Sequence, residues 1–171
     1  FESQLMSAYY LPYQDQLLYT IKFKGEDFFM GKIGATSFIF SEISIWVNQN
    51  TTNRTVKSHQ GMFFMVDFNK QISGDVVVMF KDAPHDLTQT SLSPVELEDP
   101  VFNDSFDVYA SNQVEARYIL TPAFMRQCLA LQKEIGFPIN FSVCSGKLYV
   151  DVCTHYDFFE PSLMNNPISY D

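Results

Sequence analysis

Residues 121–136 read TPAFMRQCLALQKEIG and carry the clearest signals for a single element in this 171-residue chain. Thr121 can accept a hydrogen bond from a free backbone N–H at a helix start, and Pro122 suits the first helical turn because its missing N–H is not needed there. Gly136 can adopt the left-handed conformation that ends a helix. The sequence therefore predicts a helix over 122–135.

The apolar residues of this segment repeat with helical spacing. Phe124, Cys128, Leu131 and Ile135 recur at intervals that place them on one face of a helix. A helix of this length is marginal alone in water, so its apolar face needs a partner to cover. We expect that partner to be a β-sheet.

The residues after the helix predict a β-hairpin whose register follows from a two-residue turn at 145–146. On one face this turn pairs Val143 with Leu148, Phe141 with Val150, and Ile139 with Val152. On the other face it pairs Ser142 with Tyr149, and Asn140 with Asp151. A shift of one residue would mix apolar and polar partners, so the register is strongly specified.

The residues before the helix alternate in the manner of strands. The predicted strands are 17–24, 28–33, 37–47, 56–68, 75–81, 95–98 and 106–110. The segments 56–68 and 75–81 are expected to form a pair of central strands, because both contain runs that are apolar on two faces. A change of phase at 41–42 predicts a bulge that would turn both apolar sets of 37–47 toward the core.

Short helices and loops complete the expected architecture. Asp99 and Pro100 can start a helical turn, and Ser111 can cap a short helix that leads by an extended link into Thr121. Breaks and loops are expected at 25–27, 48–55 and 82–93, a short helix is weighed before Pro12, and the tail 158–171 is expected to follow the surface.

These elements predict one α+β domain over 1–171, with a mainly antiparallel sheet and the helix at 122–135 packed on one face. A sheet that curls toward a barrel is an alternative. The chain contains 17 Phe and 9 Tyr, which favours strands and a well-filled core.

The charge and the cysteine content limit the partners. The net charge of −9 argues against nucleic acid, because phosphate binding needs clustered Lys and Arg. Three cysteines without a disulfide-like spacing favour a reducing compartment. The glycosylation-like triplets 50–52 and 53–55 are therefore interpreted as chance.

Two clusters could hold a metal or act as an acid or base. Asp151, Cys153 and His155 alternate along a predicted strand and have zinc-ligand chemistry, although one strand seldom supplies a whole site. His85 lies with two carboxylates, Asp82 and Asp86. A solvated strand end and a surface cluster are the favoured interpretations, so no metal, cofactor or catalytic residue is assigned.

Other charged residues are interpreted as structural. His59 lies in a predicted strand without an obvious partner and is expected to be either satisfied or exposed. The densest acidic group is expected to be a solvated face, because its spacing matches no calcium loop; it consists of Glu96, Glu98, Asp99, Asp104 and Asp107. Arg117, close to Glu115, is expected to form an ion pair with this group. No phosphate-binding loop, nucleophile elbow or Cys-x-x-Cys motif occurs.

Several motifs resemble a bacterial family that is known only as a domain of unknown function. The resemblance covers nearly the whole chain. The motifs are Gly25-Glu26-Asp27, Gly31-Lys32-Ile33-Gly34, Phe40-Ser41-Glu42, Gly61-Met62-Phe63-Phe64 with Asp67-Phe68-Asn69-Lys70, Leu97-Glu98-Asp99-Pro100 to Phe106-Asp107-Val108-Tyr109, and Gln113-Val114-Glu115-Ala116-Arg117-Tyr118-Ile119-Leu120-Thr121-Pro122.

The resemblance implies a membrane-anchored protein, because members of the family carry two membrane-spanning helices ahead of a soluble domain. It implies a bacterial inner-membrane location with this domain facing the cytoplasm, and genes near those of LemA-type membrane proteins. The chain begins with Phe1, so we expect it to be a fragment of such a protein. The family has no established catalytic residues to carry over.

Together these observations favour a non-catalytic interaction module that binds another protein, which could itself be a membrane protein, through sheet edges or exposed aromatic side chains. The alternative is a metal-dependent hydrolase that uses His85, or the trio Asp151, Cys153 and His155.

Overall fold

The computed structural model describes residues 19–49, 52–82, 91–154, 156 and 158–159. The expectations for the residues before Pro12, for the loop 83–90 and for most of the tail lie outside these residues. Within them the chain forms an eight-stranded antiparallel sheet in the order β1-β2-β3-β8-β7-β4-β6-β5. The strands are β1 (Tyr19–Ile33), β2 (Thr36–Gln49), β3 (Arg54–Asp67), β4 (Val76–Phe80), β5 (Ser93–Pro94), β6 (Phe106–Ala110), β7 (Ile139–Cys144) and β8 (Lys147–Cys153).

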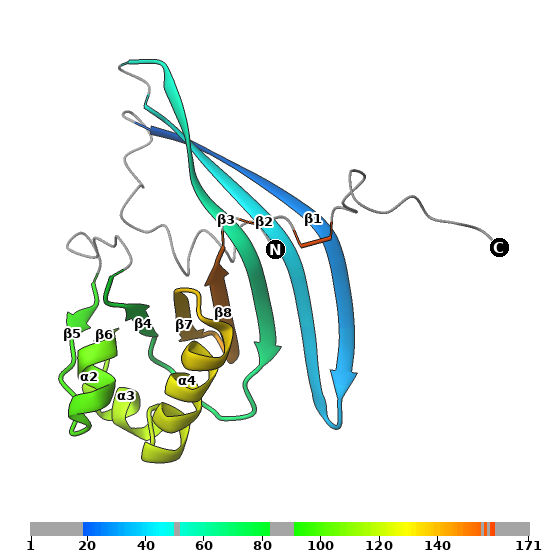
Figure 1. Cartoon of the computed structure of the whole chain (residues 1–171). Coiled ribbons are helices and arrows are strands. Elements are labelled where there is room, and N and C mark those ends of the chain that lie inside the picture. The colour runs from blue at the N-terminus through cyan, green and yellow to red at the C-terminus, as the bar shows by residue number, and fades with distance from the viewer. Residues whose placement is uncertain (1–18, 50–51, 83–90, 155, 157, 160–171) are drawn as a thin grey trace.

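The predicted α+β class with a mainly antiparallel sheet is confirmed. The alternative of a barrel is wrong, because β1 and β5 end the strand order and do not pair with each other. Figure 1 shows the three long strands β1, β2 and β3 curving away from a block of shorter strands and helices. The helices are α2 (Pro100–Ser105), α3 (Gln113–Ile119) and α4 (Pro122–Ile135).

The helix α4 has the predicted bounds and caps. Thr121 Oγ1 accepts a hydrogen bond from Phe124 N at 3.3 Å, and Gly136 has a left-handed φ of 71°. The predicted inner face is only partly correct, because Leu131 is exposed whereas Met125 is buried. Phe124 and Ile135 pack at the edge of the core, and Cys128 is buried within it.

The main core lies between the helices and one face of the sheet, which we call the helix face. It contains residues from all three helices and from β4, β6, β7 and β8; its most enclosed members include Phe102, Phe106, Ile119, Ile139, Val76 and Val78. A smaller cluster lies on the opposite face, which we call the second face, and contains Ile43, Ile45, Phe63 and Tyr149. The sheet therefore buries apolar side chains on both faces.

The predicted bulge at 41–42 is wrong. β2 is a single strand, and its pairing with β3 shifts only between Ile45 and Trp46. The change of phase instead assigns the two apolar sets to different faces. Phe40 contacts Phe64, which packs against the main core, whereas Ile43 belongs to the cluster on the second face.

The break predicted at 25–27 is also wrong, because β1 continues through it. Its pairing with β2 is irregular between Glu26 and Phe29, and Asp27 has a positive φ of 49°. A bulge therefore absorbs the residues that local sequence suggested would end the strand. The predicted loop 48–55 is shorter than expected, since β2 extends to Gln49 and β3 begins at Arg54.

Three further predictions need correction. β3 and β4 are internal strands as expected, but they do not pair with each other: β3 lies between β2 and β8, and β4 lies between β7 and β6. Residues 95–98 follow β5 instead of forming a strand. The helix predicted after Ser111 is α3, and its cap is Asn112, whose side chain accepts hydrogen bonds from Val114 N and Glu115 N.

The hairpin of β7 and β8 has the predicted register at each of its five derived pairs. Ser145 and Gly146 form its turn, with φ angles of 50° and 72°. Two positive φ angles are typical of the turn that matches the twist of paired strands. The hairpin thereby places Asn140 opposite Asp151 on the second face.

Candidate functional site

A row of three buried polar side chains, His59, Asp151 and Asn140, crosses the second face over β3, β8 and β7. The Nε2 atom of His59 lies 3.0 Å from Oδ1 of Asp151, and both side chains are more than nine-tenths buried. Asn140 Nδ2 donates a hydrogen bond of 3.1 Å to the other carboxylate oxygen, Oδ2. Asn140 is itself fixed, because its Oδ1 accepts a hydrogen bond of 2.9 Å from Phe80 N.

Gly61 lies on β3 between His59 and Phe63, the residue that is paired with Asp151. Gly61 itself is paired with Cys153. A Cβ atom at Gly61 would lie 1.9 Å from the carbonyl oxygen of Val152. The missing side chain therefore permits the close approach of the β3 and β8 backbones.

The protonated form of His59 is favoured in this environment. Burial lowers the pKa of His59, but the charge of Asp151 and hydrogen bonding to Asp151 and Cys153 outweigh burial and raise the pKa to about 10. His59 is thus an imidazolium at neutral pH, and its contact with Asp151 is an ion pair.

The trio considered for a metal is only partly described. Asp151 is buried and paired, so the interpretation of a solvated strand end is wrong for it. Cys153 is partly buried on the same strand, and His155 lies outside the described residues. The partner that the sequence missed is His59, and no local signal reveals it because β3 and β8 are distant in sequence.

The second predicted cluster also falls largely outside the description. His85 and Asp86 are not among the described residues, and Asp82 is exposed. No group of three or more His, Cys, Asp or Glu residues in the described ranges could hold a metal ion.

The acidic group is dispersed. Asp99 caps α2 by accepting hydrogen bonds from two backbone N–H groups, and Asp107 lies 4.0 Å from Lys81. Arg117 does not form the predicted ion pair with this group; its Nη2 donates to the main-chain oxygen of Glu96 at 3.1 Å. Glu115 instead accepts hydrogen bonds from Ser73, which lower the pKa of its carboxyl group.

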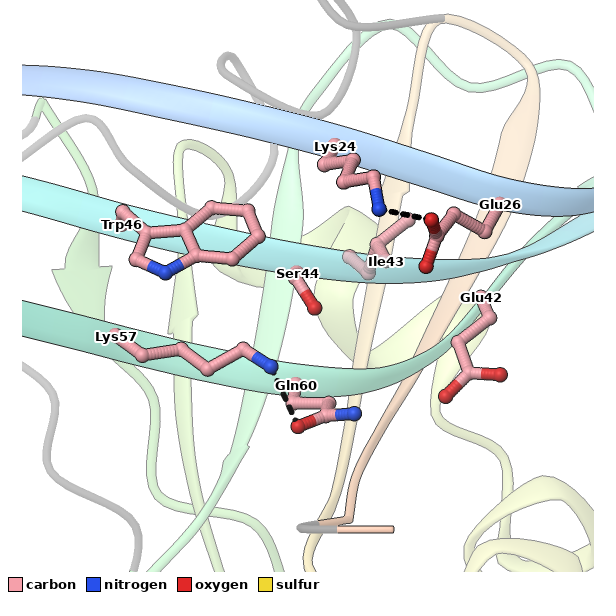
Figure 2. A pocket seen from close by; sticks show the side chains of 8 residues that line it. All are labelled: Lys24, Glu26, Glu42, Ile43, Ser44, Trp46, Lys57 and Gln60. Carbon is pink, nitrogen blue, oxygen red and sulfur yellow. Dashed lines mark hydrogen bonds and ion pairs between the residues drawn. The ribbon is translucent and has the colours of Figure 1, made fainter. Parts of the chain in front are cut away.

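A pocket of about 280 Å³ lies across β1, β2 and β3 (Figure 2). Its lining residues are Lys24, Glu26, Glu42, Ile43, Ser44, Trp46, Lys57 and Gln60. Cross-strand pairing explains the arrangement: Ser44 lies between Lys24 and Gln60, and Glu26 lies opposite Glu42.

The cations of this pocket are already engaged. Lys57 Nζ donates to Gln60 Oε1 at 2.7 Å and lies 5.3 Å from the centre of the Trp46 ring. Lys24 forms an ion pair with Glu26 (Figure 2). Ligand pockets are mostly apolar with a few convergent polar groups, whereas this pocket is polar and its charges neutralise one another. It does not define a ligand by itself.

The most exposed apolar side chains of the sheet lie on β1, its edge strand. Met30 is 70% exposed and Ile33 is 75% exposed, and Phe28 and Phe29 are also exposed. One side of the Phe29 ring is covered, because it stacks on Phe40 of β2 with ring centres 4.8 Å apart. Within the described part of the chain β1 therefore has one neighbouring strand, β2, and carries exposed apolar side chains.

The fold places this chain among α+β proteins with an open antiparallel sheet and helices on one face. A comparison with protein families matches residues 57–171 to the family described as "Protein of unknown function (DUF3137)". The match covers most of the chain, so the chain belongs to this family. Neither the curated proteins nor the solved structures contain a match.

The match begins within β3, so the first three motifs of the resemblance lie ahead of the matched residues. The described residues contain no helix that is both long and apolar enough to cross a membrane.

Proposed function

We propose that this chain is the interaction domain of a bacterial membrane-anchored protein and that it binds a protein partner along β1. The observation that carries the proposal is the exposure of Met30 and Ile33 on an edge strand of 15 residues. A long edge with exposed apolar side chains is a template for pairing with another chain, and proteins usually shield such edges.

The physical basis is addition of a strand from the partner. The backbone of β1 would supply hydrogen bonds, and side chains on its two faces would supply specificity. Glu26 and Lys24 bring one wall of the polar pocket to this same strand. A partner segment paired with β1 would therefore have apolar residues beside Met30 or Ile33 and polar residues beside the pocket.

Membrane attachment is the second part of the proposal. All three cysteines of the chain are free, which is consistent with a reducing compartment. We propose the cytoplasmic side of the bacterial inner membrane as the location. Fractionation of the full-length protein, with protease added to spheroplasts or to inverted vesicles, tests it: cleavage only in inverted vesicles is expected, and cleavage in intact spheroplasts would contradict it.

The edge is tested in the full-length protein by two substitutions, Met30→Lys and Ile33→Lys, and a matched control, Val114→Lys. Val114 is 76% exposed on α3, away from the edge. The two edge substitutions should lower partner capture from native membranes at least tenfold, because a charge opposes apolar pairing at an edge. The control should leave it unchanged. Equal capture by all variants would contradict the use of β1.

A further inference from the structure

The three long strands project beyond the rest of the sheet at one end. β3 pairs with β8 from Gly61 to Asp67, so its residues 54–60 lie beyond this pairing. Residues 44–49 of β2 and 19–24 of β1 accompany them. At about 3.3 Å per residue the projection is roughly 20 Å long. Figure 1 shows it at the end of the sheet that is farthest from the helices. We call residues 19–24, 44–49 and 54–60 the distal end.

The distal end is basic although the chain as a whole is acidic. It contains no Asp or Glu, and its four cations are exposed; they are Lys22, Lys24, Arg54 and Lys57. The other seven Lys and Arg residues and all 20 Asp and Glu residues lie elsewhere, which gives the rest of the chain a net charge of −13. Next along the strands come Glu26, which forms an ion pair with Lys24, and Glu42, which is buried.

The single Trp of the chain lies among these cations. Trp46 is paired with Lys22 on one side and with Lys57 on the other, and Lys57 Nζ lies 5.3 Å from the centre of its ring. Trp46 is partly buried, and Val56, which alternates to the other face of β3, is 48% exposed. Trp is enriched at membrane–water interfaces, and Lys can cover apolar surface there while its ammonium group stays in water.

We propose that the distal end docks on the surface of an anionic membrane, with its Lys side chains beside lipid phosphates and Trp46 at the level of the headgroups. A flat membrane meets only the projection. The acidic remainder of the chain then stays about 20 Å away, more than two Debye lengths at physiological salt. Nucleic acid is disfavoured as the occupant, because such binding typically uses about six to ten phosphate contacts.

This surface is separate from the part of β1 that is proposed to pair with a partner. Lys22 and Lys24 lie before the irregularity in the pairing of β1 with β2, whereas Met30 and Ile33 lie beyond it. Membrane docking requires neither a partner strand nor an anchor, so either proposal can fail without the other. In a membrane-anchored protein, docking would hold the sheet with the helices directed away from the lipid (Figure 1).

The test mixes the 171-residue chain with phosphatidylcholine vesicles that contain either about 30% phosphatidylglycerol or none. Each Lys or Arg near an anionic surface strengthens binding about fivefold, so four cations predict half-saturation at about 1–2 mM accessible lipid at low salt. Because Trp46 is the only Trp, its fluorescence should shift to shorter wavelength and be quenched by brominated lipid. No binding at about 10 mM lipid, or equal binding to neutral vesicles, would overturn the proposal.

Charge substitutions locate the surface. Lys22→Gln with Lys57→Gln should raise the lipid concentration for half-saturation at least tenfold, because two contacts of about fivefold each are lost. The control, Arg126→Gln with Lys133→Gln, makes the same change in net charge at exposed positions of α4 and should change it less than twofold. Circular dichroism checks that both variants are folded. Equal losses for the two pairs would overturn the proposal.

Two further measurements keep the test decisive. If Lys22→Gln with Lys57→Gln does not fold, the wild-type chain decides alone: its vesicle binding should fall at least fivefold between about 50 and 200 mM salt, and binding independent of salt would overturn the proposal. A single-stranded RNA serves as the competing occupant. A shift of Trp46 fluorescence with RNA but not with anionic vesicles would also overturn the proposal.

Discussion

The ion pair of His59 and Asp151 joins two residues that local sequence patterns cannot connect. Each is a single residue within an alternating strand, and their contact depends on the pairing of β3 with β8. Gly61 permits the close approach of these two strands. Breaking a buried ion pair leaves one charge uncompensated, which is more costly than losing an exposed pair. The interaction therefore couples the long strands to the hairpin of β7 and β8.

Raising the pH should weaken the fold through His59. The pKa of His59 rises from 6.5 to about 10 on folding, so the folded chain holds this proton more tightly than the unfolded chain. The stabilisation is full below about pH 6.5 and is lost as the pH rises through 10. For one proton the free energy of unfolding falls by at most ~1.4 kcal/mol per pH unit.

Urea unfolding of wild type and of His59→Gln from pH 6 to pH 10 measures this effect. Asp151 and Cys153 are the charged or titratable neighbours that act on His59. The difference between the two proteins should shrink by about 3–5 kcal/mol across the range. Parallel curves for the two proteins would show that His59 does not carry the pH dependence.

Glycine at position 61 should be required by sterics. Gly61→Ala would place a Cβ 1.9 Å from a backbone oxygen of β8, so the strands would have to separate. We expect a loss of about 3 kcal/mol or more in the free energy of unfolding. The matched control is Gly25→Ala on β1, where the nearest atom is Ser41 Oγ at 3.4 Å, and its effect should be within about 1 kcal/mol. Similar losses for both would contradict this account.

At the scale of single elements, sequence patterns correctly predicted the features that depend only on neighbouring residues. The caps of α4 and the turn between β7 and β8 are set by residues adjacent to them, and both were predicted correctly. The burial of α4 was predicted less well. Spacing placed Leu131 inside, but Leu131 is exposed and the inner face includes Met125, which belongs to the main core.

Two truncations in α4 distinguish the predicted face from the observed one. Met125→Ala removes a side chain that is 5% exposed and should cost about 2–4 kcal/mol of unfolding free energy. Leu131→Ala removes one that is 36% exposed and should cost about 1 kcal/mol or less. Chemical denaturation compares them, and a larger loss for Leu131→Ala would restore the face expected from spacing.

β2 shows why strands were harder to predict than the helix. Its two apolar sets change phase, and the sequence suggested a bulge because one buried face was assumed. The sheet has a buried cluster on each face, so a regular strand accommodates both sets. Whether one or both faces of the sheet are covered depends on the assembled fold, so it cannot be predicted from the sequence of one strand.

At the scale of the whole molecule, the fold class followed from alternation and composition, but the strand order did not. The order requires β8 to lie between β3 and β7, and the residues that β3 and β8 pair are 80 to 92 positions apart in the sequence. This order leaves β1 at an edge of the sheet. It also brings His59, Asp151 and Asn140 together on the second face. The sequence pattern indicated Asp151 but not its partner His59, because their contact is a product of the strand order.

Pairing of a protein partner with β1 can be tested in living cells. The most direct measurement is photo-crosslinking in living cells of the full-length protein, with a photoreactive amino acid at position 30 or 33 and, as the control, at position 114 on α3. A discrete protein adduct from the two β1 positions and none from position 114 is the expected result. The absence of an adduct from β1, or the same adduct from all three positions, would contradict the claim.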